Sequence, residues 1–231
     1  MTKTAVVFVL VALSAACFAG DENSFYAKLP GGLVMPAEML EEWRWEEKKQ
    51  SADLKEEMKN GYLIGLKLGY QPPLFNQILA LEIEYSYQRA DFYKIMSPGF
   101  NAGPFAVDGF YSEAKNSYMT FNSIFLNLIA RYPEGSMHPY IGVGPGMTRM
   151  FVSFSESNLT KEGFGFNEVG DDDTFCYQIV AGVDYDLNPS ISIGAGYKYF
   201  AAKPTMTWKN GTKSDYDPVT NSFVIDVKYH F

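Results

Sequence analysis

Hydrophobic and polar residues alternate along many short segments of this chain, most regularly in its last ten residues. In residues 222–231, SFVIDVKYHF, one face would carry Phe223, Ile225, Val227, Tyr229 and Phe231, and the other Ser222, Val224, Asp226, Lys228 and His230. A period of two residues is typical of a β-strand with one apolar face. The chain is therefore predicted to end on such a strand, with an aromatic residue at its last position.

Seven earlier segments show the same period and are also predicted to be strands. They are residues 24–35, 62–70, 77–88, 117–132, the segment from residue 138 that carries PYIGVGPGM, 175–187 and 190–200. The first is the least regular, because Pro30 and two glycines lie within it and a proline cannot donate to a ladder. Together with the last strand, these segments predict an all-β fold of eight antiparallel strands with up-and-down topology.

The connections between the predicted strands alternate in length. QPPLFN, PEGSM and NPS are short, whereas residues 36–60, 90–116, 155–173 and 201–221 are long and polar. Short periplasmic turns and long extracellular loops are typical of a transmembrane β-barrel, and an even number of strands leaves both ends in the periplasm. A closed barrel is also the way to cross a membrane without a membrane helix.

The N-terminus indicates export. Lys3 precedes an apolar run, residues 5–16, and small residues at Cys17 and Ala19 suit cleavage before Gly20. We therefore predict a signal peptide over residues 1–19 and a barrel domain over residues 20–231. The alternative, a lipidated Cys17, lacks the usual leucine three residues earlier, where Ser14 stands.

Composition excludes several classes of function. The net charge of the chain is −8, and removal of residues 1–19 takes away only Lys3, which leaves −9. Such an acidic protein is not expected to bind nucleic acid. Cys176 is then the one remaining cysteine, so an intramolecular disulfide, a zinc cluster or a redox pair cannot form. We expect no cofactor, no metal and no catalytic residue.

Charges decide which face of each strand points inward. Glu82 and Glu84 alternate with apolar and aromatic residues, and two carboxylates facing lipid would be strongly unfavourable. The same reasoning places ten charged residues in the lumen: Lys28, Lys67, Arg131, Lys198 and Lys228 against Glu82, Glu84, Asp184, Asp186 and Asp226. Unpaired buried ions cost several kcal/mol each, so these groups are expected to pair. Because eight strands leave room only for side chains, we predict a plugged, charge-balanced lumen.

Several segments resemble those of a known family. GYLIGLKLGY, LALEIEYSY, PYIGVGPGM, YQIVAGVDYDL, IGAGYKYF and VKYHF are similar to strands of the outer-membrane β-barrel domains of OmpA-type, OmpX-type and opacity-type surface proteins. The resemblance covers essentially the whole predicted mature chain and implies the outer membrane of a Gram-negative-type bacterium. It implies outer-membrane lipid and the barrel assembly machinery as partners, with Val227, Tyr229 and Phe231 in the assembly signal. We expect no peptidoglycan-binding domain after the barrel.

The resemblance is specific for the fold but indicates little about function. We expect a structural or surface-interaction role through the extracellular loops, with an extracellular protein or surface ligand as partner. The alternative is a narrow porin-like barrel for small solutes. A third and weaker reading is a lipid-modifying enzyme, for which the resemblance implies a His and a Ser near the outer leaflet. His138 falls in a predicted periplasmic turn and His230 at the periplasmic mouth, so neither is placed for that chemistry.

Two loop segments carry unusual charge. Residues 36–60 hold eight acidic and five basic residues, with apolar residues spaced as in one or two short amphipathic helices. Trp43 and Trp45 in this segment could bind a partner, lie on the membrane or pack over the barrel mouth. If residues 24–35 are not a strand, the segment is instead a periplasmic or interfacial helix. Residues 171–173 are three successive aspartates, which we interpret as part of a solvated loop, since their spacing is not that of a calcium loop.

Overall fold

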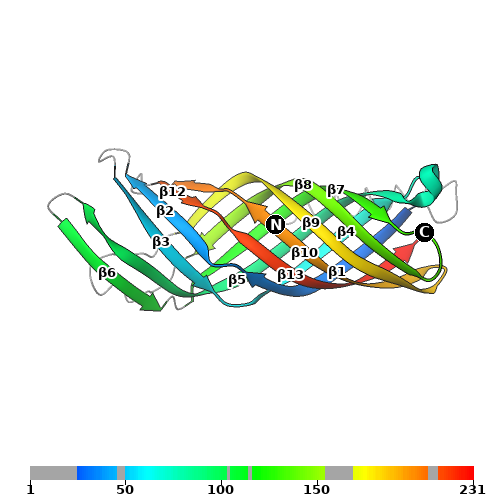
Figure 1. Ribbon diagram of the computed structural model, residues 1–231, viewed down its shortest axis with the longest axis horizontal. Coiled ribbons are helices and arrows are strands. Elements are labelled where there is room, and N and C mark those ends of the chain that lie inside the picture. The colour runs from blue at the N-terminus through cyan, green and yellow to red at the C-terminus, as the bar shows by residue number, and fades with distance from the viewer. Residues whose placement is uncertain (1–24, 46–49, 103–104, 114–115, 154–168, 208–212) are drawn as a thin grey trace.

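A barrel of eight long strands forms most of the protein (Figure 1). The computed structural model describes residues 25–45, 50–102, 105–113, 116–153, 169–207 and 213–231, so the predicted signal peptide lies outside the described residues. The barrel strands are β1 (Phe25–Pro36), β4 (Gly61–Tyr70), β5 (Leu79–Ala102), β7 (Tyr118–Arg131), β8 (Met137–Ser153), β9 (Val169–Asn188), β10 (Ile191–Ala202) and β13 (Val219–His230).

Each barrel strand pairs antiparallel with its neighbours in chain order, and the last strand closes the ring on the first. β13 pairs with β1 from Tyr26 opposite His230 to Pro36 opposite Thr220. β1 also pairs with β4, although this ladder is interrupted at Leu29 and Pro30, where the proline has no N–H to donate. The prediction of an eight-stranded antiparallel barrel, with residues 24–35 as its first strand, is confirmed.

The two ends of the barrel differ. At one end, called here the short-turn end, the strands are joined by residues 71–78, 132–136 and 189–190, and the first of these turns contains the 3₁₀ helix η1 (Leu74–Gln77). At the other end, β5, β8 and β9 continue well beyond the predicted strand boundaries. They are accompanied by β2 (Met39–Trp45), β3 (Gln50–Met58), β6 (Phe105–Glu113), β11 (Thr205–Thr207) and β12 (Lys213–Tyr216).

These additional strands form a second sheet, called here the sheet extension, in the order β11-β12-β2-β3-β5-β6 (Figure 1). The helices expected within residues 36–60 are therefore wrong: β2 and β3 form a hairpin whose outer partners are β12 and β5. Large parts of the expected loops 90–116 and 201–221 are also strand, and of the expected loop 155–173 the described residues 169–173 belong to β9. The physical reason is that the continuing edge of β5 offers unpaired backbone groups, and ladder hydrogen bonds to it outweigh a helical spacing of apolar residues.

Charged side chains lie on the surface of the sheet extension. Lys55 of β3 forms an ion pair with Glu38, and both side chains are well exposed. The hydrogen bond to Glu38, aided by its negative charge, raises the pKa of the Lys55 ammonium above its ordinary value. Polar pairs of this kind suit a surface in contact with water.

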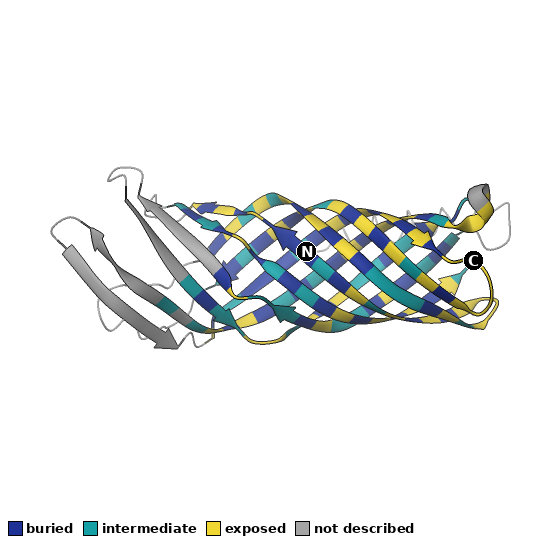
Figure 2. Cartoon of the chain, in the orientation of Figure 1, coloured by how far each residue is buried: buried dark blue, intermediate teal, exposed yellow. Residues whose placement is uncertain are grey.

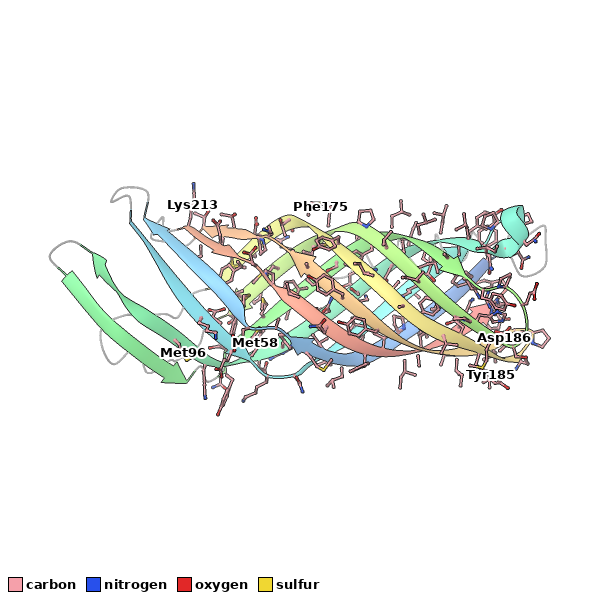
Figure 3. All side chains as sticks on the ribbon, in the orientation of Figure 1. Met58, Met96, Phe175, Tyr185, Asp186 and Lys213 are labelled. Atoms are coloured by element: carbon pink, nitrogen blue, oxygen red, sulfur yellow. The ribbon has the colours of Figure 1, made fainter. Side chains whose placement is uncertain are left out.

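Burial alternates residue by residue along the barrel strands (Figure 2). The outward face is apolar, with exposed leucine, isoleucine, valine and aromatic side chains on every barrel strand. Exposed tyrosines stand near the short-turn end at Tyr70, Tyr132, Tyr185 and Tyr229. Figure 3 places Tyr185 beside Asp186 at that end, and Met58 and Met96 toward the sheet extension. An apolar band flanked by aromatic residues is the surface that a bilayer requires.

Among the described residues, no helix has the length and hydropathy needed to cross a membrane.

Candidate functional site: the barrel lumen

The inward face of the strands is polar and charged along most of the lumen. Lys28, Lys67, Lys198 and Lys228 are each no more than 4% exposed, and Glu82, Glu84, Asp184 and Asp226 no more than 2%. Strand alternation explains this placement, because each charged residue is flanked by residues that face outward. The lumen therefore holds a dense set of ions that must satisfy one another.

Glu84 is the centre of the buried ions that lie farther from the short-turn end. Its carboxylate forms ion pairs with Lys198 and, at 3.5 Å, with Lys67. It also accepts hydrogen bonds from Asn127 Nδ2 at 3.0 Å and from Gln178 Nε2 at 2.8 Å. Four donors from four different strands thus converge on one carboxylate, which stabilises its negative charge although it is out of contact with water.

A second group of ions lies nearer the short-turn end. Lys28 Nζ is 3.0 Å from Asp184 and 3.9 Å from Glu82, and Lys228 Nζ is 3.4 Å from Asp184. Tyr26 donates a hydrogen bond to Glu82 at 2.8 Å, and its ring lies 4.1 Å from Lys228 Nζ. Lys67 links the two groups, because it is also 4.0 Å from Glu82.

Gly194 makes room for two of these carboxylates. It stands between Asp184 of β9 and Asp226 of β13 in the sheet. A Cβ atom at Gly194 would lie 2.5 Å from Asp226 Oδ1 and 2.9 Å from Asp184 Oδ1, so a side chain there would displace them. Asp226 Oδ1 has no hydrogen-bond partner among the described residues, so this carboxylate is less fully satisfied than Glu84.

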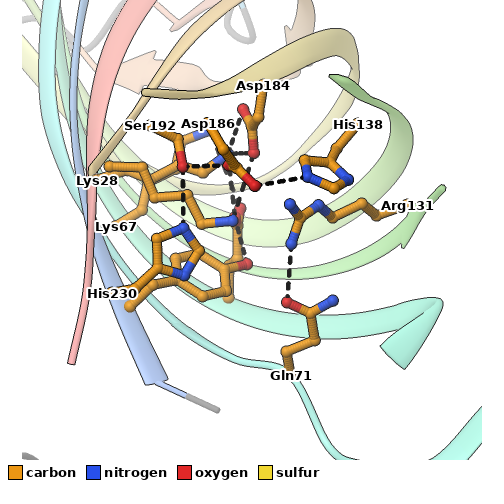
Figure 4. Close-up of polar contacts among 12 residues, drawn as sticks. Lys28, Lys67, Gln71, Arg131, His138, Asp184, Asp186, Ser192 and His230 are labelled. Carbon is orange, nitrogen blue, oxygen red and sulfur yellow. Dashed lines mark hydrogen bonds and ion pairs between the residues drawn. The ribbon is translucent and has the colours of Figure 1, made fainter. Parts of the chain in front are cut away.

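The short-turn mouth of the lumen holds a separate chain of contacts (Figure 4). His138 Nδ1 is 2.9 Å from the Tyr132 carbonyl oxygen, and its Nε2 is 2.7 Å from Asp186 Oδ2. Ser192 donates to Asp186 Oδ1 at 2.6 Å and lies 3.0 Å from His230 Nε2. His138 is 4% exposed and belongs to β8, so its assignment as a turn residue was wrong. The reason is that β8 begins one residue earlier and turns His138 inward.

The lumen thus brings seven of the ten expected charged residues into one connected network: Lys28, Lys67, Lys198, Lys228, Glu82, Glu84 and Asp184. Asp226 lies beside Asp184. Asp186 and Arg131 are at the mouth, where Asp186 contacts His138 and Ser192, and Arg131 donates to Gln71 Oε1 at 3.0 Å. Neither therefore pairs with an oppositely charged partner of the expected set.

An apolar layer lies in the lumen between the ions and the sheet extension. We call it the plug, and its buried members are Met39, Phe92, Met119, Phe121, Phe125, Met150, Val152, Cys176, Phe200, Ala202, Met206 and Tyr216. Phe200 packs against Phe121 at 5.1 Å and Phe125 at 6.2 Å between ring centroids. This layer was not predicted from the sequence, although Met119 and Phe121 fall on the inward face of the predicted strand 117–132.

Three aspartates expected in a loop belong instead to β9. Asp171 and Asp173 lie on its outer face, and both contact Arg149 of β8. Asp172 accepts a hydrogen bond from the backbone N–H of Thr205, which fastens β11 to β9. Cross-strand pairing with Arg149 explains why three successive acids remain in a strand. No group of three or more His, Cys, Asp or Glu side chains in the described part of the chain is arranged to hold a metal ion.

The last strand presents Val227, Tyr229 and Phe231 outward, each at least 41% exposed. Phe231 packs against Tyr229 at 5.2 Å between ring centroids, and its backbone N–H donates to the carbonyl of Phe25 at 3.1 Å. The three side chains therefore form an accessible apolar row at the closing seam of the barrel.

An apolar outer belt, a closed ladder and an ion-filled interior define a membrane-spanning β-barrel of the outer-membrane class. The chain belongs to the outer membrane protein beta-barrel domain family, whose model matches residues 5–231. It is therefore an outer-membrane protein. In such barrels the short turns face the periplasm and the long loops face the exterior. We propose accordingly that the short-turn end is the periplasmic end and that the sheet extension is extracellular.

Solved structures with the same fold include three outer-membrane proteins. OprG from Pseudomonas aeruginosa is 17% identical, with 92% of this chain and 99% of that chain covered and a TM-score of 0.59. Neisserial surface protein A is 16% identical, with 91% and 99% covered and a TM-score of 0.50. The outer membrane protease OmpT from Escherichia coli is 8% identical, with 90% and 96% covered and a TM-score of 0.52. At such identities the likeness concerns the fold alone. Comparison with curated proteins finds no significant match.

Replacing Glu84 by leucine is expected to lower the free energy of unfolding by about 3–5 kcal/mol, because Lys67 and Lys198 would stay buried without their shared partner. The double variant Glu84→Leu, Lys198→Met should lose less than Glu84→Leu alone. Unfolding by urea in phospholipid vesicles measures both.

Asp171→Asn is the matched control, since it removes an acid from an exposed ion pair, and such pairs contribute little. If Asp171→Asn and Glu84→Leu destabilise the barrel equally, Glu84 does not organise the lumen.

Proposed function

We propose that this protein is a closed outer-membrane barrel with a structural or surface-interaction role, carried out by its extracellular strands. The observation that carries the proposal is the two-layer filling of the lumen. Paired ions occupy the periplasmic part of the lumen, and the plug occupies the part between these ions and the sheet extension. A solute would have to break buried ion pairs and then cross a layer of methionine and phenylalanine side chains. Both steps are unfavourable, and they act in series.

The sheet extension is where we place the interaction. It projects beyond the barrel as a hairpin of β2 and β3 and a second hairpin of β5 and β6 (Figure 1). Rigid barrels commonly carry their binding function on such projecting segments. The partner we propose is an extracellular protein or another surface ligand.

Two further partners follow from the outer surface of the barrel. The apolar belt suits outer-membrane lipid, and the aromatic residues at its edges suit the headgroup region. The exposed row Val227, Tyr229 and Phe231 is the segment that we propose the barrel assembly machinery recognises.

We propose that the protein is not an enzyme. Ser192 contacts the His230 ring, but it is fully buried and donates its hydrogen bond to Asp186. A nucleophilic serine must instead donate to the histidine and remain open to substrate. The order of contacts, histidine to serine to carboxylate, therefore favours a structural role for Ser192.

One observation favours the second candidate function, a narrow path for small solutes. Three plug residues, Met39, Met206 and Tyr216, are carried by β2, β11 and β12, which are not barrel strands. Displacement of these strands would thin the plug without opening the barrel wall.

The two candidates differ in conductance. Purified protein in planar lipid bilayers is expected to show no stable single-channel steps, because the plug and the ion pairs close the lumen. The variant Phe121→Ser, Phe200→Ser is expected to produce steps, since it removes two packed rings from the plug. Leu126→Ser, on the outer face of the same barrel, is the control and should remain closed. Stable steps from the unmodified protein would refute the closed barrel and favour the narrow path.

An epitope tag inserted between β2 and β3 is expected to be accessible to antibody on intact cells, because the sheet extension lies outside. A tag inserted in the turn 132–136 is the matched control and should be reached only after the outer membrane is broken. Exposure of the control tag alone would reverse the topology and remove the basis for a surface role.

A further inference from the structure

Arg131 is a buried cation without an acidic partner. The residue is 9% exposed, and its guanidinium donates one hydrogen bond, from Nη1 to Gln71 Oε1 at 3.0 Å. Its Nε is buried and has no hydrogen-bond partner. Among the residues that the structure describes, no carboxylate lies within ion-pair distance of the guanidinium. Arginine is otherwise the side chain best suited to bind a planar anion through two parallel hydrogen bonds.

The acids nearest the mouth are already occupied. Asp184 is held by Lys28 and Lys228, and Asp186 is held by His138 and Ser192 (Figure 4). Neither can turn to Arg131 without leaving another buried group unpaired. The positive charge of Arg131 is therefore not balanced by a redistribution of these contacts.

The guanidinium is held in place by its surroundings. Gln71 Nε2 donates to the Gln77 carbonyl oxygen at 2.5 Å, which leaves Gln71 Oε1 to receive Arg131. Asn76 and Gln77 both adopt left-handed backbone conformations, with φ of 52° and 61°. Two successive residues of this kind without glycine are strained, and such strain is concentrated at ligand clamps.

We propose that the periplasmic mouth binds a carboxylate group, anchored by the Arg131 guanidinium and carried by a small solute or by the end of a peptide. A carboxylate gives the Arg131 guanidinium the acidic partner that no described residue supplies, and it matches the planar fork of arginine. A phosphate matches less well, because its second charge would lie near Asp186 (Figure 4). The proposal does not depend on whether the barrel conducts, since the site lies below the plug.

The test is a titration of the purified, folded barrel in detergent micelles at constant ionic strength. The probes are acetyl-alanine, its uncharged analogue acetyl-alaninamide and inorganic phosphate, and the readout is the NMR signal of the Arg131 Nε–H group together with calorimetry. Saturable binding of acetyl-alanine is expected, with at least a tenfold weaker effect of the amide and of phosphate. Equal effects of acetyl-alanine and its amide, or stronger binding of phosphate, would overturn the proposal.

Three variants separate the site from general effects of charge. Arg131→Gln should weaken binding of acetyl-alanine at least tenfold, and Gln71→Leu should weaken it less, because it releases the guanidinium without removing it. Arg89→Gln removes an exposed arginine that pairs with Asp91 at the other end of the barrel, and should bind as the unmodified protein does. Unchanged binding in folded Arg131→Gln would refute the site, and Gln71→Leu keeps the test open if Arg131→Gln does not fold.

Acetate and acetyl-trialanine distinguish the two sources of the carboxylate. Both are expected to bind. Tighter binding of the peptide, through contacts of its chain with the mouth, assigns a peptide end, whereas equal binding assigns a free small carboxylate. Absence of binding by both would contradict the proposal.

Discussion

The closure of β13 on β1 is the constraint on which the rest of this structure depends. In a bilayer every backbone N–H and C=O of the wall must be paired within the protein, and eight strands joined in a ring satisfy this condition. The ring also fixes a narrow interior, into which every second residue of every strand must fit. The charges and hydrogen-bonding groups of those polar residues must then find partners inside the lumen, because the outer face contacts lipid.

The lumen accommodates its inward-facing side chains in two ways. In the part nearer the short-turn end, carboxylates such as Glu84 accept hydrogen bonds and ion pairs from several strands, so burial does not leave them without partners. In the part toward the sheet extension, apolar side chains replace the ions, and residues of β2, β11 and β12 contribute to the packing. Because ions and apolar side chains together occupy the lumen, the strands of the sheet extension are the proposed site of interaction. At the proposed periplasmic mouth, one cation, Arg131, lacks an acidic partner.

The two-residue period of the sequence predicts the eight strands, their faces and the ions that enter the lumen, because each depends only on local alternation. It does not predict which ions meet. Lys198 and Glu84 are 114 residues apart, and their contact depends on the register and tilt of strands across the barrel. The hairpin of β2 and β3 was misread as helical for a related reason: its stability comes from pairing with β5 and β12, which no local spacing reveals. His138 was placed in a turn because hydropathy does not mark the start of a strand, whereas β8 begins where backbone hydrogen bonds form, as from Asp186 N–H to the Ser136 carbonyl.

The central claim is that the lumen is dry and closed at the plug, and Cys176 tests it most directly. Its side chain is fully buried in the plug, and Cys17, the other cysteine of the chain, falls in the predicted signal peptide. The folded barrel in lipid vesicles should be treated with a small uncharged maleimide and compared with the protein unfolded in urea. We expect Cys176 to remain unmodified in the folded barrel while it reacts completely in the unfolded chain. Modification at comparable rates in both states would contradict a closed lumen.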